Sequence, residues 1–79
     1  MTRAYDIVSG EMVELPDGWI VSQDGVENRA EGLAVVITGP HGRWVPTRDK
    51  RAIRSPSGRP RYFRSILAGI KALAQEGDR

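Results

Sequence analysis

The sequence predicts an α+β fold: a small antiparallel β-sheet of three to five strands with one C-terminal α-helix packed on one face. Three observations lead to this prediction. Short β-rich runs alternate with turn signals as far as Thr47. From Pro60 the spacing of the apolar residues changes from a strand period to a helical one. A chain of 79 residues has room for only one core, so the helix and the sheet must share it.

We expect a single domain over residues 1–79 with four parts. Such a short chain buries only about 60% of its unfolded surface, so modest stability is expected and a homodimer would be compatible with it. The parts are an N-terminal β-hairpin or arm (1–15), a β-sheet core (16–47), a basic loop (48–59) and a C-terminal helix (60–76).

The first strands are expected at 5–8 and 12–15, on either side of a tight turn at Ser9-Gly10. Pro16-Asp17-Gly18 then interrupts the chain, because proline and glycine favour turns. A third strand is predicted at 19–22.

Asp24-Gly25 follows as a strong hairpin signal, and 26–32 either continues a strand or forms a loop. The clearest strand is 33–38, because its β-branched run suits a buried position. A turn at 39–42 should lead into an antiparallel strand at 43–47. Pro46 predicts that this strand lies at an edge of the sheet or ends there, since proline donates no hydrogen bond.

The C-terminal helix is predicted from its apolar stripe. It could begin at Pro60, or at Ser65 as an N-cap with 62–64 still extended. Gly77 is a natural stop, and Gly69 weakens the helix unless close packing requires it. The stripe consists of Phe63, Ile66, Leu67, Ile70, Leu73 and Ala74.

Charge is unevenly distributed along the chain. Residues 1–42 carry two basic groups against seven acids, and residues 43–79 carry ten basic groups against three. Such asymmetry is typical of a surface for nucleic acid or for another charged partner. The two halves could instead fold against each other and pair their charges.

The segment 48–64 holds seven of the twelve basic side chains, and Asp49 is its one acid. Six of the seven are arginine, whose planar fork matches phosphate groups and guanine edges. Tyr62 lies within this cluster and would either stack on a base or pack in the core. The segment could also be solvated, or dock on an acidic protein. The predicted nucleic-acid-binding residues are Arg43, Arg48, Lys50, Arg51, Arg54, Arg59, Arg61, Tyr62 and Arg64.

Catalytic and metal-binding patterns are missing from the sequence. It has no cysteine, and its one histidine, His41, lies in an expected turn. We therefore expect no enzyme, no cofactor and no metal site. The N-terminal residues lack the apolar run of a signal peptide, and the longest apolar run, LAVVI, is too short to span a bilayer. A cytoplasmic protein without membrane contact is expected.

Two motifs carry a family resemblance. LPDGW at 15–19, followed by GPHGRW at 39–44, looks like the spacing of methyl-CpG-binding domains. SPSGRPRYFRS at 55–65 is similar to that family's turn and basic segment. Over about residues 15–76 the chain resembles the wider group of three-stranded-sheet-plus-helix DNA-binding domains, which includes AP2 and phage-integrase arm-binding domains. The resemblance implies DNA as a partner and, in one placement, Arg64 as a DNA-reading residue.

Two hypotheses about function follow. The first is a small non-enzymatic nucleic-acid-binding protein, accessory or regulatory, that holds duplex DNA through its arginine-rich loop. The alternative is a phage- or plasmid-type protein-interaction module that inhibits a host complex through its acidic half. In the alternative, a sheet edge, Trp19 and Trp44 would supply contacts, although both tryptophans also suit a core. The acidic residues concerned are Glu11, Glu14, Asp17, Asp24, Glu27 and Glu31.

Overall fold

The structure is a computed structural model that describes residues 2–38 and 42–77. It confirms the predicted α+β fold, with two antiparallel sheets and one C-terminal helix. His41 and most of the turn expected at 39–42 lie outside the described residues. The elements are β1 (Arg3–Asp6), β2 (Glu11–Glu14), β3 (Ile20–Ser22), β4 (Gly25–Asn28), β5 (Leu33–Ile37), β6 (Trp44–Arg48), β7 (Arg51–Ala52) and α1 (Ile66–Gly77).

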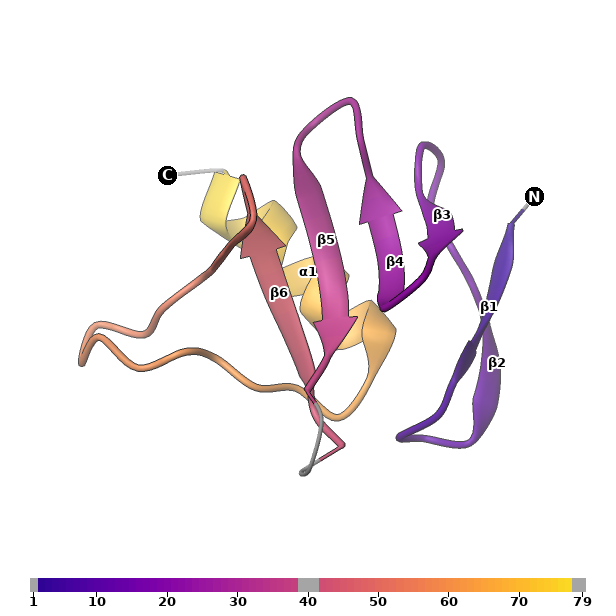
Figure 1. Ribbon diagram of the computed structural model, residues 1–79, viewed down its shortest axis with the longest axis horizontal. Helices are drawn as coiled ribbons and strands as arrows, with labels where there is room; N and C mark the ends of the chain where they lie inside the picture. The colour runs from indigo at the N-terminus through magenta and orange to yellow at the C-terminus, as the bar shows by residue number, and fades with distance from the viewer. Residues whose placement is uncertain (1, 39–41, 78–79) are drawn as a thin grey trace.

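The larger sheet has five strands in the order β3-β4-β5-β6-β7, so each strand pairs with the next one along the chain. Strands β1 and β2 form a separate hairpin, which stands beyond β3 in Figure 1. A hairpin forms at the predicted Asp24-Gly25 signal, but its two-residue turn is Gln23-Asp24, and Gly25 begins β4 as the partner of Ser22. Of the ambiguous residues 26–32, the first part belongs to β4.

The helix α1 lies behind the five-stranded sheet in Figure 1 and contacts β5 and β6. Val35 and Pro46 face it, because they are register partners and both lie beside Gly69 of the helix. Side chains alternate between the two faces of a strand, so the register also defines the face turned away from α1. We call it the outer face; its residues are Ile20, Ser22, Gly25, Glu27, Ala34, Val36, Val45, Thr47 and Ala52.

The helix begins at Ile66, so a start at Pro60 is wrong and the alternative start is confirmed. Ser65 caps the helix, because its hydroxyl accepts a hydrogen bond from the Ala68 amide at 3.1 Å. Residues before it remain extended, since Phe63 pairs with Trp44 through two main-chain hydrogen bonds of 2.7 and 2.8 Å. Pairing with the sheet thus overrides the helical pattern of that segment.

The buried stripe of α1 differs in part from the predicted one. Ile66, Ile70 and Leu73 are buried as expected, together with Ala72. Leu67 is 43% exposed and Ala74 is exposed as well, so their predicted burial is wrong. The cause is the orientation of the helix, which turns Gly69 toward the sheet and leaves the Leu67 side of the cylinder facing outward.

Pro46 lies inside the sheet, so its predicted position at an edge is wrong. β7 pairs on the side of β6 that faces away from β5, and the Ile53 amide donates to the Pro46 carbonyl at 3.0 Å. Proline cannot return this hydrogen bond, and the Ile53 carbonyl instead accepts from the Arg61 amide at 3.1 Å. Pro46 therefore ends the pairing of β6 with β7 and directs the following residues away from the sheet.

One buried carboxylate joins the N-terminal hairpin to the rest of the fold. Asp6 is fully buried, and its Oδ2 accepts a hydrogen bond from the Ile66 amide at 2.8 Å. Its Oδ1 accepts from the Trp44 indole at 2.8 Å and from the amides of Val8 and Ser9 at 3.0 and 3.1 Å. The carboxylate thus lies at the N-terminus of α1, where the helix dipole favours negative charge.

Burial by itself raises the pKa of the Asp6 carboxyl, because the charged form loses its water. The hydrogen bonds from the Ile66 and Ser9 amides, the Trp44 indole and the Val8 amide favour the charged form and outweigh burial. The pKa of Asp6 therefore lies below its ordinary value. Its contribution to stability is complete above the unfolded-state pKa of about 3.9 and is lost as pH falls through the folded-state value.

Replacement of Asp6 should reveal this linkage. Asp6→Asn should lower the free energy of unfolding by about 2–4 kcal/mol at neutral pH. The amide NH2 group of asparagine would face N–H groups that need an acceptor, so at least one of their hydrogen bonds would be lost. The difference in melting temperature between the two proteins should be constant from pH 7 to 5 and shrink below about pH 4, where first the unfolded-state carboxyl and then, at lower pH, the native carboxylate takes up a proton. Thermal melts followed by circular dichroism across this range test it; a difference that stays constant in acid would contradict the assignment.

Gly69 should tolerate no side chain, although alanine is the better helix former. A Cβ atom there would lie 2.9 Å from one methyl carbon of Val35 and 3.5 Å from Cγ of Pro46. Gly69→Ala should therefore cost about 1–3 kcal/mol of unfolding free energy in urea melts. In a Val35→Ala background, which removes the obstructing methyl groups, the same change should be neutral or stabilising. Equal costs in both backgrounds would show that packing is not the cause.

Candidate nucleic-acid interface

A main-chain anchor positions the segment that carries Tyr62. The two hydrogen bonds between Trp44 and Phe63 hold this segment beside β6, and Phe63 packs against the core. The Arg61 guanidinium lies 5.1 Å from the centre of the Phe63 ring, so both side chains share the helix-facing side. Because neighbouring residues alternate, Tyr62 is directed to the outer face, where it is 56% exposed.

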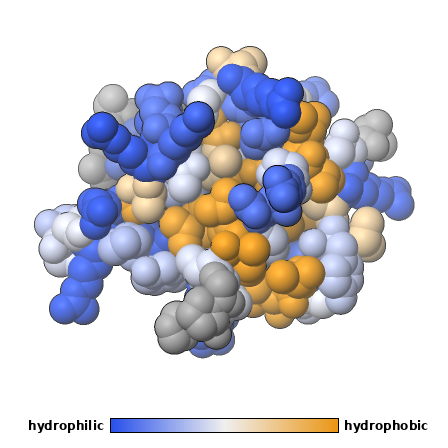
Figure 2. Space-filling model, in the orientation of Figure 1, coloured by the Kyte–Doolittle hydropathy of each residue, from blue (hydrophilic) through white to orange (hydrophobic). Residues whose placement is uncertain are grey.

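The outer face is largely apolar where β5 meets β6. Val36 and Val45 are register partners there and lie outside the core cluster beneath the helix; Val36 is half-buried and Val45 is 6% exposed. Figure 2 views the molecule from this side and shows an apolar area at its centre with hydrophilic side chains around it. In Figure 1 the helix α1 lies on the opposite side of the sheet. Tyr62 thus stands beside an apolar sheet surface that no helix of the described residues covers.

Residues 49–62 project from the sheet as an arm, which we call the basic arm (Figure 1). It starts at a tight turn in which Asp49 and Lys50 adopt φ of 53° and 69°, a left-handed conformation that is unfavourable for non-glycine residues. At the tip, the Ser55 amide donates to the Arg59 carbonyl and the Gly58 amide to the Ser55 carbonyl, both at 2.8 Å. The predicted basic loop is therefore a hydrogen-bonded excursion that includes β7.

The predicted binding residues divide into two groups. Arg48 and Arg61 are half-buried and serve the fold: the Arg48 guanidinium donates to the Leu73 carbonyl at 3.3 Å, and Arg61 lies over Phe63. Arg43 is also half-buried, and its main chain bonds to Thr38 beside the turn. The exposed group comprises Lys50, Arg51, Arg54, Arg59, Tyr62 and Arg64.

Within the exposed group, the Arg54 guanidinium also supports the tip of the arm. It donates to the Gly58 carbonyl at 2.8 Å, which leaves most of its donors directed to solvent. In residues 2–38 and 42–77, the one ion pair joins Arg29 to Glu27 at 3.0 Å. No carboxylate of the acidic half therefore pairs with a cation of the basic arm among these residues.

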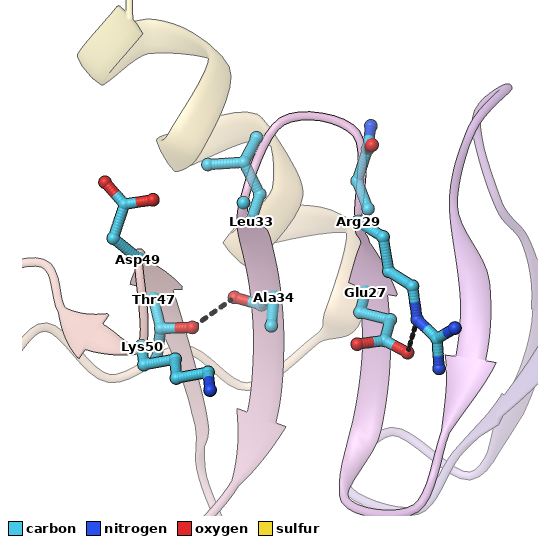
Figure 3. A pocket seen from close by; sticks show the side chains of 9 residues that line it. Glu27, Arg29, Leu33, Ala34, Thr47, Asp49 and Lys50 are labelled. Carbon is cyan, nitrogen blue, oxygen red and sulfur yellow. Dashed lines mark hydrogen bonds and ion pairs between the residues drawn. The ribbon is translucent and has the colours of Figure 1, made fainter.

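A hollow of about 280 Å³ lies at the root of the basic arm (Figure 3). Ala34 and Thr47 form part of its lining, and the Thr47 hydroxyl donates to the Ala34 carbonyl at 3.4 Å. Glu27 of β4 and its ion-pair partner Arg29, which follows β4, border it on one side, and Lys50 borders it on the arm. Because Glu27, Ala34 and Thr47 belong to the outer face, the hollow extends that face.

Sequence reasoning missed the apolar outer face and the role of Asp6. The hydrogen bonds from the Val8 and Ser9 amides to Asp6 could have been predicted from the sequence, since aspartate before a Ser-Gly turn commonly accepts main-chain hydrogen bonds. The apolar outer face could not be predicted from residues 33–37, because this strand is apolar throughout and shows no alternation of polar and apolar side chains. The described part of the chain contains no group of three metal-binding side chains, and none of its helices has the length and hydropathy to cross a membrane.

Comparison with protein-family models, with curated proteins and with solved structures finds no match for this chain.

Proposed function

We propose that the protein is a small, cytoplasmic, non-enzymatic nucleic-acid-binding factor with an accessory or regulatory role. The observation that carries the proposal is the set of exposed arm cations, which no carboxylate neutralises among the described residues. Arginine binds phosphate through a planar fork, and four of the exposed cations are arginine: Arg51, Arg54, Arg59 and Arg64.

The construction of the arm supports contact with a phosphate backbone. Hydrogen bonds at its tip and its base, the latter from the Arg61 amide to the Ile53 carbonyl, hold its main chain in place. Fewer degrees of freedom are then lost on binding than with a disordered basic tail. Duplex DNA, which the sequence favours, is the first ligand to test, because its regular phosphates suit a fixed row of cations.

A protein-interaction module remains the second proposal, and a groove at the other end of the molecule favours it. The groove measures about 290 Å³ and is lined by Tyr5 and Ile7 on one side and by Val21 and Asp24 on the other. Its apolar rim and its exposed acid suit a partner with apolar and basic side chains. A phage- or plasmid-type inhibitor could bind a host complex through such a groove. Trp19 and Trp44 are 6% and 3% exposed, so tryptophans would not supply the contacts.

Salt dependence tests the first proposal. Affinity for a short DNA duplex, measured by fluorescence anisotropy between about 50 and 200 mM salt, should fall with a log–log slope of roughly −0.9 per phosphate contact. Arg51→Gln combined with Arg59→Gln should reduce the slope by about 2 units, because each arginine contacts one phosphate. Thermal stability should stay nearly unchanged, since both side chains are exposed.

A matched variant provides the control. Arg3→Gln combined with Lys71→Gln removes the same charge from exposed positions on β1 and α1 and should leave the slope unchanged. Equal effects of the two variants would indicate attraction by net charge alone and contradict the role of the arm. Absence of binding to duplex DNA, single strands and RNA at about 50 mM salt would refute the proposal and favour the interaction module.

A further inference from the structure

We propose that the outer face around Tyr62 binds unpaired bases, so that the preferred ligand is single-stranded nucleic acid. This inference rests on the proposed function and specifies its ligand. It departs from the duplex DNA that the sequence favours, and the reason is the geometry of the outer face.

Tyr62 presents an exposed aromatic side chain on a well-anchored segment. The residue is 56% exposed, although hydrogen bonds hold the main chain on both sides of it. On one side the Arg61 amide donates to the Ile53 carbonyl, and on the other Phe63 pairs with Trp44. An exposed aromatic side chain on a fixed main chain loses little freedom when a base stacks on it. Arg59 and Arg64 are exposed on the same segment and can hold the phosphates of the stacked nucleotide.

The surface beside Tyr62 is apolar. In the extended register set by Trp44 and Phe63, Tyr62 lies next to Val45, which pairs with Val36. Val45 is only 6% exposed and Val36 is half-buried, so the accessible apolar contact comes from Val36 and the Tyr62 ring, which offer no hydrogen bond along their faces. A duplex encloses its base faces and presents phosphates and groove edges, which polar side chains read. Unpaired bases expose their faces, and an apolar sheet with an aromatic ring suits those faces.

Charge sets the direction of the bound strand. Across β4, the outer face forms a broad, shallow hollow of about 590 Å³ that is lined by Asp24, Glu27, Ala34 and Val36, and also by Arg29, the ion-pair partner of Glu27. The Asp24 carboxylate repels phosphates, and both carboxylates can accept hydrogen bonds from base amino groups. The backbone should therefore follow the basic arm and Arg64, while the bases point across β6 and β5 toward this hollow. About two or three bases would occupy the sheet.

Tyrosine variants separate stacking from charge. Fluorescence anisotropy with labelled oligo(dT) of about fifteen nucleotides should show binding at least about tenfold tighter than to a duplex of equal length. Tyr62→Leu keeps an apolar side chain without the ring and should weaken oligo(dT) binding about tenfold or more, with an unchanged salt slope. Tyr62→Phe keeps the ring and should bind like the parent.

The chain offers a matched control in Tyr5, which is also 56% exposed but lies on the N-terminal hairpin, whose strand β2 carries the exposed acids Glu11 and Glu14. Tyr5→Leu should leave oligo(dT) binding unchanged. Melting temperatures of all three variants within a few degrees of the parent would establish that folding is intact.

Three results would overturn the inference and leave the proposed function standing: equal or tighter binding to duplex, parental oligo(dT) affinity of Tyr62→Leu, or equal losses for Tyr5→Leu and Tyr62→Leu. A fall in the sedimentation mass of Tyr62→Leu without nucleic acid would assign this face to a second copy of the chain, which also overturns it. Loss of all nucleic-acid binding in the parent would instead refute the proposed function itself.

Discussion

The fold depends on one buried carboxylate that has no cationic partner among the described residues. Asp6 holds the first turn of α1 through the Ile66 amide and fixes the Trp44 indole through its other oxygen. Trp44 in turn holds Phe63 by its main chain, so the carboxylate indirectly places the segment that carries Tyr62. A charged group can remain buried here because four donors and the helix dipole replace its water. The hairpin, the sheet and the helix therefore share a single polar junction.

The helix α1 covers one face of the five-stranded sheet. That inner face supplies Val26, Val35 and Pro46 to the core, while half-buried Val36 and Val45, which is 6% exposed, lie on the other side. Exposed apolar sheet surfaces favour association, and charged side chains at their margins limit it. The basic arm provides such charges at one margin. The outer face is thus both a liability for solubility and a surface that is available for a partner.

Local signals predicted much of this fold. The Asp24-Gly25 hairpin, the strand at 33–37 and the apolar period of α1 all depend on neighbours in the sequence. The contacts of Asp6 could not be predicted, because its partners Trp44 and Ile66 lie 38 and 60 residues away. The position of Pro46 within the sheet could not be predicted either. Proline has no amide hydrogen to donate to the Ile53 carbonyl, and the Arg61 amide, distant in sequence, donates to it instead.

For the candidate site, composition indicated the charge but not its distribution between fold and surface. Arg48 and Arg61 look the same as Arg51 and Arg59 in the sequence, yet the first two contact a helix carbonyl and an aromatic ring. Tyr62 had two open interpretations, and the pairing of its neighbour Phe63 with Trp44 decides between them. The pairing was hidden in the sequence because Phe63 also fits the helical spacing of the apolar residues that follow it. A single apolar residue between polar neighbours suits a helix and a strand equally well.

The basic arm and the N-terminal hairpin lie at opposite ends of the longest axis of the molecule (Figure 1), which extends 34 Å. Glu11 and Glu14 are exposed on the hairpin at one end, and arginines are exposed on the arm at the other end. The protein therefore carries a permanent electric dipole along its length. In the field of any polyanion this dipole exerts a torque that turns the arm forward before contact. Approach is thereby reduced from a search over all orientations to a small range of them. The same alignment leaves the hairpin and its apolar groove directed outward, accessible to a second molecule while the first is held.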